Sequence, residues 1–252
     1  MNLIIYCLLK AEKNTIHRLP KGIDGLPVKL IKYNEIYAAV SSINQKELPV
    51  SNPPVSLILA YENVIEAFYK HTTILPMRYG SFLEELQVIE LLEKHHEEYL
   101  LGLKYLKGCT EFGIRMILPV NTQNLQREKN DFIIEDFDSS TGSSYLKSLK
   151  KFYLKDDKIK QEDAKLNKWC SCAFAGIYKE YKLENSAVNQ NNKNRLLSFY
   201  FLVWKEFTES FKKQFRELIP PSGGKILMSG PWPPYNFVAN ALQEKTLNSK
   251  NR

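Results

Sequence analysis

Few side chains in this 252-residue sequence stand at spacings that would support catalysis or metal binding. His95 and His96 precede Glu97 and Glu98, but this order is not the H-E-x-x-H pattern that binds zinc. Adjacent residues on a helix point about 100° apart, so the two imidazoles would not share one face. His96 falls on the apolar stripe of the expected helix. We therefore interpret it as a hydrogen-bonded histidine in or beside a core.

The four cysteines, Cys7, Cys109, Cys170 and Cys172, do not have the spacing of a disulfide framework. A reducing cytoplasm is therefore the expected compartment. Cys170 and Cys172 are two residues apart in a segment with helical signals, so their side chains would point away from each other. We interpret them as small buried apolar side chains, with thiol pairing and metal binding as the alternatives.

Sequence motifs of common enzymes are absent. There is no G-x-x-x-x-G-K-[ST] phosphate loop, no G-x-G-x-x-G dinucleotide turn and no G-x-S-x-G nucleophile elbow. The favoured interpretation is a protein that is not an enzyme. If a catalytic centre exists, the first residues to inspect are Glu111, Arg78 and His71, as titratable groups in a cleft.

The formal net charge of +7 does not by itself indicate a nucleic-acid partner. Acidic residues interrupt the longest basic region, Lys147–Lys168, so a Lys-rich solvated surface is the favoured explanation. The aromatic run Leu196–Trp204 lacks the glycine of the RNA-recognition pattern. No apolar run reaches the roughly 18 residues that cross a bilayer. We therefore expect neither a nucleic acid nor a lipid membrane as partner.

The order of the expected strands and helices predicts an α+β protein. Its first part is an N-terminal α/β domain over residues 1–108. Asn2–Leu9 is apolar on both alternating faces, which is typical of a central strand covered on two sides. Val28–Lys32 and Glu35–Ser42 predict a hairpin. Apolar residues recur with helical spacing after Pro54, as far as Tyr69, and again over Glu84–Lys107.

A second domain is expected over residues 109–229, as a sheet with helices on one face. The expected strands are Ile114–Leu118, Leu196–Trp204 and Lys225–Ser229. Helical signals run from about Tyr145 to Tyr181 and predict a helical hairpin, within an insertion at about 140–194. Residues 230–252 are expected to form a Pro-rich C-terminal tail.

The most unusual stretch is Ser229–Val238, SGPWPPYNFV. Its three prolines fix φ and remove three backbone donors, while Gly230 permits a sharp exit from the preceding strand. Trp232 and Tyr235 offer large rigid surfaces with polar tips. One interpretation, favoured for Trp232, is a plug buried against the core. The other is a docking surface for another protein. Full burial would make Trp232→Ala cost about 3–5 kcal/mol.

This decapeptide resembles the C-terminal signature of the gas vesicle protein F/L family, Gly-Pro-Trp-Pro-Pro-Tyr-Ser-Phe, with Asn236 in place of the usual serine. The matching residues are Gly230, Pro231, Trp232, Pro233, Pro234, Tyr235 and Phe237. Tyr6 in the first strand and Ala38–Ser41 in the hairpin also fall where the family would place them. With the matches at Thr73–Gly80, Glu111 and Tyr145, the resemblance extends from Met1 to about Val238.

Thr73–Gly80, TILPMRYG, is similar to the family's Val-Leu-Pro-Leu-Arg-Phe-Gly segment and carries Pro76, Arg78 and Gly80. The GSSYL stretch with Tyr145 is similar to the family's Gly-x-x-Tyr-Leu, and Glu111 also falls where the family places it. For Arg78 we favour a buried pair that ties the Pro76 strand to the Tyr235 region, since a planar guanidinium suits such sites. The alternative is that Arg78 binds a partner's carboxylate.

The resemblance implies two α/β-type domains, the second ferredoxin-like with a helical hairpin appendage, and a C-terminal tail. It implies a non-enzymatic minor structural or assembly protein of the gas vesicle, the gas-filled protein shell that gives aquatic microbes buoyancy. Such a protein would lie at the vesicle, in the cytoplasm, and would need no cofactor.

The expected partners are the vesicle shell protein and other gas vesicle accessory proteins. We expect contact through exposed apolar surface on the hairpin around Trp169–Tyr181 and on the tail. The alternative is a transient, chaperone-like assembly factor that leaves the finished vesicle. A remote alternative is an RNA-binding or enzymatic α+β protein.

Overall fold

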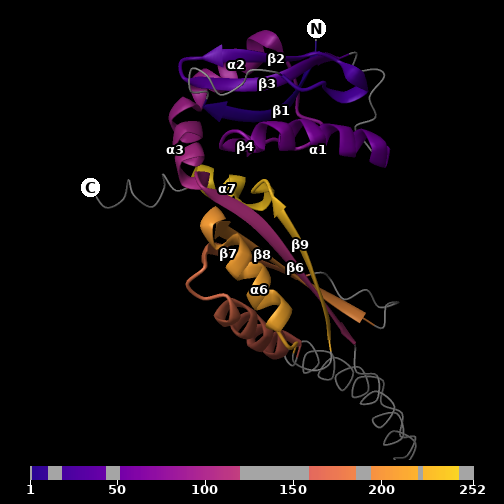
Figure 1. Ribbon diagram of the computed structural model, residues 1–252. Coiled ribbons are helices and arrows are strands. Elements are labelled where there is room, and N and C mark those ends of the chain that lie inside the picture. The colour runs from indigo at the N-terminus through magenta and orange to yellow at the C-terminus, as the bar shows by residue number, and fades with distance from the viewer. Residues whose placement is uncertain are drawn as a thin grey trace, which may run out of the picture. The chain divides into compact units, whose positions relative to one another are not determined.

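The computed structural model describes residues 2–10, 19–43, 52–119, 159–185, 194–220 and 224–243. Packing divides the chain into two compact units (Figure 1). The first contains Met1–Phe112, Leu202–Glu206 and Gly230–Arg252, and the second contains Gly113–Phe201 and Phe207–Ser229. The C-terminal stretch therefore packs with the N-terminal part of the chain, although more than a hundred positions separate them in the sequence.

The first unit is built around β1 (Asn2–Lys10), the central strand of a five-stranded sheet. The strand order is β2-β3-β1-β4, and β5 also pairs with β1. The other strands are β2 (Val28–Tyr33), β3 (Ile36–Ile43), β4 (Ile74–Pro76) and β5 (Phe82–Glu84). Every residue of β1 from Leu3 to Leu9 is buried, so both faces of the strand are covered. This confirms the prediction of a two-sided central strand, and β2 and β3 form the predicted hairpin.

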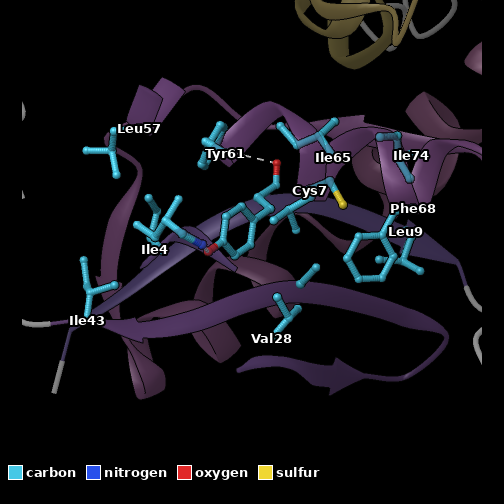
Figure 2. Close-up of a cluster of buried hydrophobic side chains, with 14 residues drawn as sticks. Ile4, Cys7, Leu9, Val28, Ile43, Leu57, Tyr61, Ile65, Phe68 and Ile74 are labelled. Carbon is cyan, nitrogen blue, oxygen red and sulfur yellow. Dashed lines mark hydrogen bonds between the residues drawn. The ribbon is translucent and has the colours of Figure 1, made fainter. Parts of the chain in front are cut away.

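Helix α1 (Val55–Tyr69) covers one face of this sheet (Figure 1). Its buried side chains repeat with helical spacing and pack in one cluster with Ile4, Cys7 and Leu9 of β1 (Figure 2). They are Leu57, Tyr61, Val64, Ile65 and Phe68. Helix α2 (Glu85–Lys94) contacts β2 and β3, and α3 (His96–Leu106) contacts β1, β3 and β4.

The prediction of one continuous helix over Glu84–Lys107 is wrong at His95, whose φ of −112° and ψ of 18° separate α2 from α3. The turn between β2 and β3 binds on both sides of this break. The Tyr33 hydroxyl donates to Glu93, and His96 Nε2 lies 3.1 Å from Glu35 Oε2. The His96 side chain is 15% exposed, which confirms a hydrogen-bonded histidine at the edge of the core.

The second unit is based on the four-stranded sheet β7-β8-β6-β9. Its strands are β6 (Cys109–Pro119), β7 (Tyr178–Asn185), β8 (Asn194–Trp204) and β9 (Lys225–Trp232). The first residues of β6 and the last residues of β8 and β9 belong to the first unit. A helix over residues 159–173 lies between β6 and β7 in the chain, and α6 (Thr208–Glu217) lies between β8 and β9. This β-α-β-β-α-β order confirms the expected ferredoxin-like arrangement.

Aromatic stacking and a buried arginine hold the second unit together. The rings of Phe174 and Phe211 stack with centroids 4.2 Å apart, and both contact Phe201 of β8. Arg195 is 9% exposed, and its guanidinium binds the carboxylates of Glu162 and Asp163 on the helix over 159–173. Removing one partner of such a buried group is strongly destabilising, so these contacts fix the helix to the start of β8.

Three further sequence predictions are corrected by the second unit. Helix does not continue to Tyr181; Tyr178 and Tyr181 lie on β7, where both rings contact Phe201. Cys170 is buried as expected, but Cys172 is exposed. The last strand continues past Ser229 to Trp232, because β9 lies at the edge of the sheet, where a proline is tolerated.

Part of the predicted helical hairpin, including Tyr145, lies outside the described residues. Within the part of the chain that the structure describes, no helix has the length and apolar content needed to span a membrane.

A buried tyrosine joins helix α1 to strand β1 and to the segment after β4. The Tyr61 side chain on α1 is 2% exposed, and its hydroxyl donates to the carbonyl oxygens of Ile5 at 2.6 Å and Met77 at 3.0 Å. Its ring contacts those of Tyr6 and Tyr79. Burial raises the pKa of Tyr61 well above its ordinary value, so the hydroxyl remains a donor.

We expect Tyr61→Phe to lower the free energy of unfolding by about 1–3 kcal/mol, because the carbonyls of Ile5 and Met77 lose the buried hydroxyl that they share as a donor. Urea denaturation measures this change. Tyr33→Phe is the matched control, since it removes an exposed hydroxyl bonded to Glu93 and should change the free energy of unfolding far less than Tyr61→Phe does. Equal losses in the two variants would contradict the assigned role of Tyr61.

Candidate functional site

The candidate site is the signature segment, residues 230–243, which packs within the first unit. It starts at the end of β9 with a cis Gly230–Pro231 peptide bond. Pro233 and Pro234 are buried, and the chain then forms the short helices η4 (Tyr235–Phe237) and α7 (Val238–Gln243). The prolines therefore lead into an ordered segment that returns to the N-terminal sheet and helices.

Glu111 on β6 anchors this segment. Its side chain is 4% exposed, and the carboxylate accepts two hydrogen bonds from one residue. Oε2 accepts from the backbone N–H of Asn236 at 2.8 Å, and Oε1 accepts from the side-chain amide of Asn236 at 2.6 Å. Hydrogen bonds to a carboxylate are about twice as strong as neutral ones. Sequence reasoning selected Glu111 without a partner, and the structure places Asn236 against it.

Gly230 is required by the close approach of β9 to β6. Its φ is +113°, which side-chain-bearing residues rarely adopt, and a Cβ there would lie 2.6 Å from the carbonyl oxygen of Glu111. The ring of Phe112 would be 3.0 Å away. Any larger residue would therefore push the strands apart beside the Glu111 anchor.

Aromatic side chains fasten the segment to the core. Phe237 is fully buried, and Tyr235 packs against the core cluster that contains Tyr61. Burial raises the pKa of the Tyr235 hydroxyl, with a smaller contribution from Glu62 of α1. Helix α7 packs on α3, where Gly102 leaves room for Leu242. The signature segment is thus held in the first unit by the hydrogen bonds of Asn236 and by the packing of Tyr235, Phe237 and Leu242.

Trp232 differs from its neighbours, because its side chain is 43% exposed. Its carbonyl oxygen accepts a hydrogen bond from Thr110 Oγ1 at 3.1 Å. The expectation that Trp232 is a buried plug is therefore wrong, and Pro233, Pro234 and Phe237 supply the buried surface instead. The physical reason is that β9 continues to Trp232 and carries this residue to the edge of the core.

Two residues that sequence reasoning missed contact the start of β6. The Tyr69 hydroxyl donates to the carbonyl oxygen of Cys109 at 2.9 Å, and Lys205 Nζ lies 4.3 Å from the centre of the Tyr69 ring. Burial raises the pKa of Tyr69 to about 12, and desolvation lowers the pKa of Lys205. No local sequence pattern predicts this cation–π pair, since the two residues are far apart in the chain.

The other predicted residues lie elsewhere in the first unit. Pro76 is buried at the end of β4, and Gly80 follows in the turn toward β5. Arg78 is exposed, so the expectation of a buried arginine pair is wrong. Tyr79, next to Arg78, connects this segment to the Tyr235 region instead. Its ring contacts Tyr61, and Tyr235 packs against the core cluster that contains Tyr61.

The three residues selected as a possible catalytic set have different environments: Glu111 is buried, whereas His71 and Arg78 are exposed. Within the described ranges, no group of three or more His, Cys, Asp or Glu side chains is arranged to hold a metal ion. The candidate site is therefore an anchored segment with an exposed indole.

These features define an α+β protein with two antiparallel sheets, the second ferredoxin-like, and an anchored C-terminal signature segment. The family model described as gas vesicle synthesis protein GvpL/GvpF matches residues 2–239. The chain therefore belongs to the GvpL/GvpF family of gas vesicle proteins, and it is associated with gas vesicles.

Two curated relatives agree with this assignment. Gas vesicle protein L of Haloferax mediterranei is 23% identical, with 90% of this chain and 75% of the relative aligned. Gas vesicle protein L of Streptomyces sp. strain CB03234 is 24% identical, with 95% of this chain and 94% of the relative aligned.

Two solved structures share the fold. The crystal structure of GvpF from Anabaena sp. PCC7120 superposes with a TM-score of 0.70 at 16% identity, and that from Microcystis aeruginosa with 0.67 at 15%. Each match covers 94% of this chain and 98% of the other. The fold is thus shared over almost the whole length.

We expect Gly230→Ala to lower the free energy of unfolding by about 2–5 kcal/mol. Two penalties add: the new Cβ clashes with the Glu111 carbonyl oxygen, and an alanine must adopt the positive φ that glycine tolerates. The matched control is Gly25→Ala. Gly25 also has a positive φ, +73°, but its Cβ would meet nothing within 4 Å, so only about 1–2 kcal/mol should be lost. Thermal or urea unfolding of both variants checks this; a similar loss in both would show that the close approach does not matter.

We expect Glu111→Gln to loosen the signature segment, because Asn236 donates to both carboxylate oxygens and the amide nitrogen that replaces one of them cannot accept a hydrogen bond. Hydrogen–deuterium exchange over residues 235–243 should rise about tenfold or more, while β1 and β3 stay protected. Asn236→Ser retains the backbone donor and should exchange only a few-fold faster. Uniform acceleration throughout the chain in Glu111→Gln would show a global loss of stability and contradict a local anchor.

Proposed function

We propose that this protein is a non-enzymatic accessory protein of the gas vesicle, located at the vesicle in the cytoplasm. It acts by protein–protein contact with the vesicle shell protein and with other gas vesicle accessory proteins. Its contribution is to the construction of the shell, and it needs no cofactor.

The observation that carries this proposal is the family match over residues 2–239, whose description refers to gas vesicle synthesis. The signature segment adds physical support. It holds a large aromatic side chain at the surface on a backbone fixed by a buried carboxylate and flanking prolines. Exposed aromatic groups on a rigid frame are well suited to contact between proteins.

The word synthesis in the family description also favours a second candidate, a transient chaperone-like factor that leaves the finished vesicle. The two candidates share their partners and differ in where the protein resides afterwards. A permanent component stays with intact vesicles through washing, whereas a transient factor is present during assembly and absent from washed vesicles.

We expect a tagged full-length chain to co-purify with the shell protein from cells that are assembling vesicles, and deletion of its gene to reduce the number of vesicles. Co-purification is measured by mass spectrometry, and vesicle number by electron microscopy or buoyant density. Retention on washed vesicles then separates the two candidates. Normal vesicles in the deletion strain, together with no recovery of vesicle proteins, would overturn the proposal.

A further inference from the structure

Both α-helices that the structure describes in the second unit lie on one face of its sheet. Arg195 of β8 binds two carboxylates on the helix over 159–173, and Phe201 of β8 contacts Phe211 of α6. Arg195 and Phe201 are an even number of positions apart, and side chains alternate across a strand, so both point to the helices. Tyr200 therefore points to the opposite face of the sheet.

This opposite face runs from β8 across β6 to β9. A Cβ on Gly113 of β6 would lie 2.9 Å from Ser229 Oγ and 3.8 Å from the Tyr200 ring, so these three positions form one row. Two positions further along their strands, Arg115 of β6 and Leu227 of β9 face the same way. We call this surface of the second unit the open face and define it by five residues: Arg115, Ile117, Tyr200, Leu227 and Lys225.

The open face is accessible to a partner. Exposure alternates along β9 over Lys225–Ser229, and Leu227 is 43% exposed. Arg115 is exposed although β6 lies inside the sheet, between β8 and β9, and Ile117 and Tyr200 are partly exposed beside it. Arginine and aromatic residues are enriched at protein interfaces. A central arginine with aromatic and aliphatic neighbours therefore indicates a contact surface.

The two charged residues of the open face are both cations. Within the described ranges, no carboxylate forms an ion pair with Arg115. Glu184 of β7, at the rim of the face, already accepts a hydrogen bond from the Tyr200 hydroxyl at 3.1 Å. Glu180 and Lys182, farther along the same side of β7, have opposite charges. A partner that is acidic where it meets Arg115 therefore complements this face in charge.

We propose that the open face binds an amphipathic helix of another gas vesicle protein, with a carboxylate in the middle of the apolar side of that helix. The carboxylate pairs with the planar guanidinium of Arg115, and the apolar side chains around it pack on Ile117 and Leu227. A helix suits this site, because helices already cover the other face of the same sheet and a second helical layer would enclose it. This inference rests on the proposed function, since it names a surface and a partner chemistry for that role.

A second copy of the chain fits the open face less well than an acidic helix does. In a two-fold dimer through this face the same residues meet from both copies, so Arg115 and Lys225 of one copy approach those of the other. Like charges brought together at an interface cost free energy, whereas a carboxylate gains free energy from the same cations. The charge of the face thus favours a different protein as its partner.

The test measures capture by the tagged full-length chain, with the shell protein and each other gas vesicle protein co-expressed singly as the probe. Arg115→Glu should reduce capture of the bound probe about tenfold or more, because two carboxylates then face each other. Arg115→Lys keeps the charge but loses the planar fork, so capture should fall only several-fold. Replacing the acidic residues of that probe singly by Arg should restore binding to the Arg115→Glu variant at one position.

Arg216→Glu is the matched control. Arg216 is exposed on α6, in the same unit but on the helical side of the sheet, so the same change of charge should leave capture within about twofold of the unmutated chain. Unfolding curves check that each variant is folded. If Arg115→Glu fails to fold, Leu227→Ala decides the matter. It shortens an exposed side chain on the edge strand β9 and should reduce capture several-fold.

The outcomes separate the two levels of the proposal. If the unmutated chain captures no vesicle protein, the proposed function fails, and this inference fails with it. If it captures a vesicle protein and the folded Arg115→Glu and Leu227→Ala variants capture it equally well, the function stands and the open face is overturned. Capture that disappears after nuclease treatment would assign a nucleic acid to the face. Loss of self-association alone, measured by sedimentation, would assign a second copy, and either result overturns the proposed partner.

Discussion

The contact between the Glu111 carboxylate and Asn236 is the interaction on which the signature segment, residues 230–243, depends. A buried carboxylate is costly unless its oxygens are hydrogen-bonded, and here both accept from a single residue. That requirement brings the end of the chain back to β6. Gly230 then allows the close approach, and Tyr235 and Phe237 add apolar burial on either side of the anchor. One polar contact thus converts a Pro-rich tail into a structural part of the N-terminal unit.

The same anchor explains how a large aromatic side chain can remain at the surface. Phe237 and Pro234 are side chains buried beneath the segment, and Trp232 does not occupy the core. Its backbone is still fixed, through Thr110 and the prolines on either side. Signature residues that look alike in sequence therefore divide into two groups. Most stabilise the segment, and Trp232 is presented to the surroundings.

The relatives show how much of this arrangement survives sequence change. Curated relatives of 23–24% identity align over nearly the whole chain, and solved structures at 15–16% identity still superpose with TM-scores of 0.67–0.70. At such distances most surface residues differ, so the shared fold must depend on features that tolerate substitution. The two-sided apolar strand β1 and the ferredoxin-like order of the second sheet are features of that kind, because many apolar residues satisfy them.

The sequence alone determined the elements whose pattern is local. The apolar run of β1, the hairpin of β2 and β3, the spacing of α1 and the family resemblance of residues 230–237 all follow from neighbouring residues in the chain. Tertiary structure decided what depends on distant neighbours. Residues on both sides of His95 bind the β2–β3 turn, Tyr181 joins a strand against Phe201, and Trp232 stays exposed because other residues fill the core. Periodicity reports which side of an element is apolar, but contacts between remote segments decide which apolar side chains are covered.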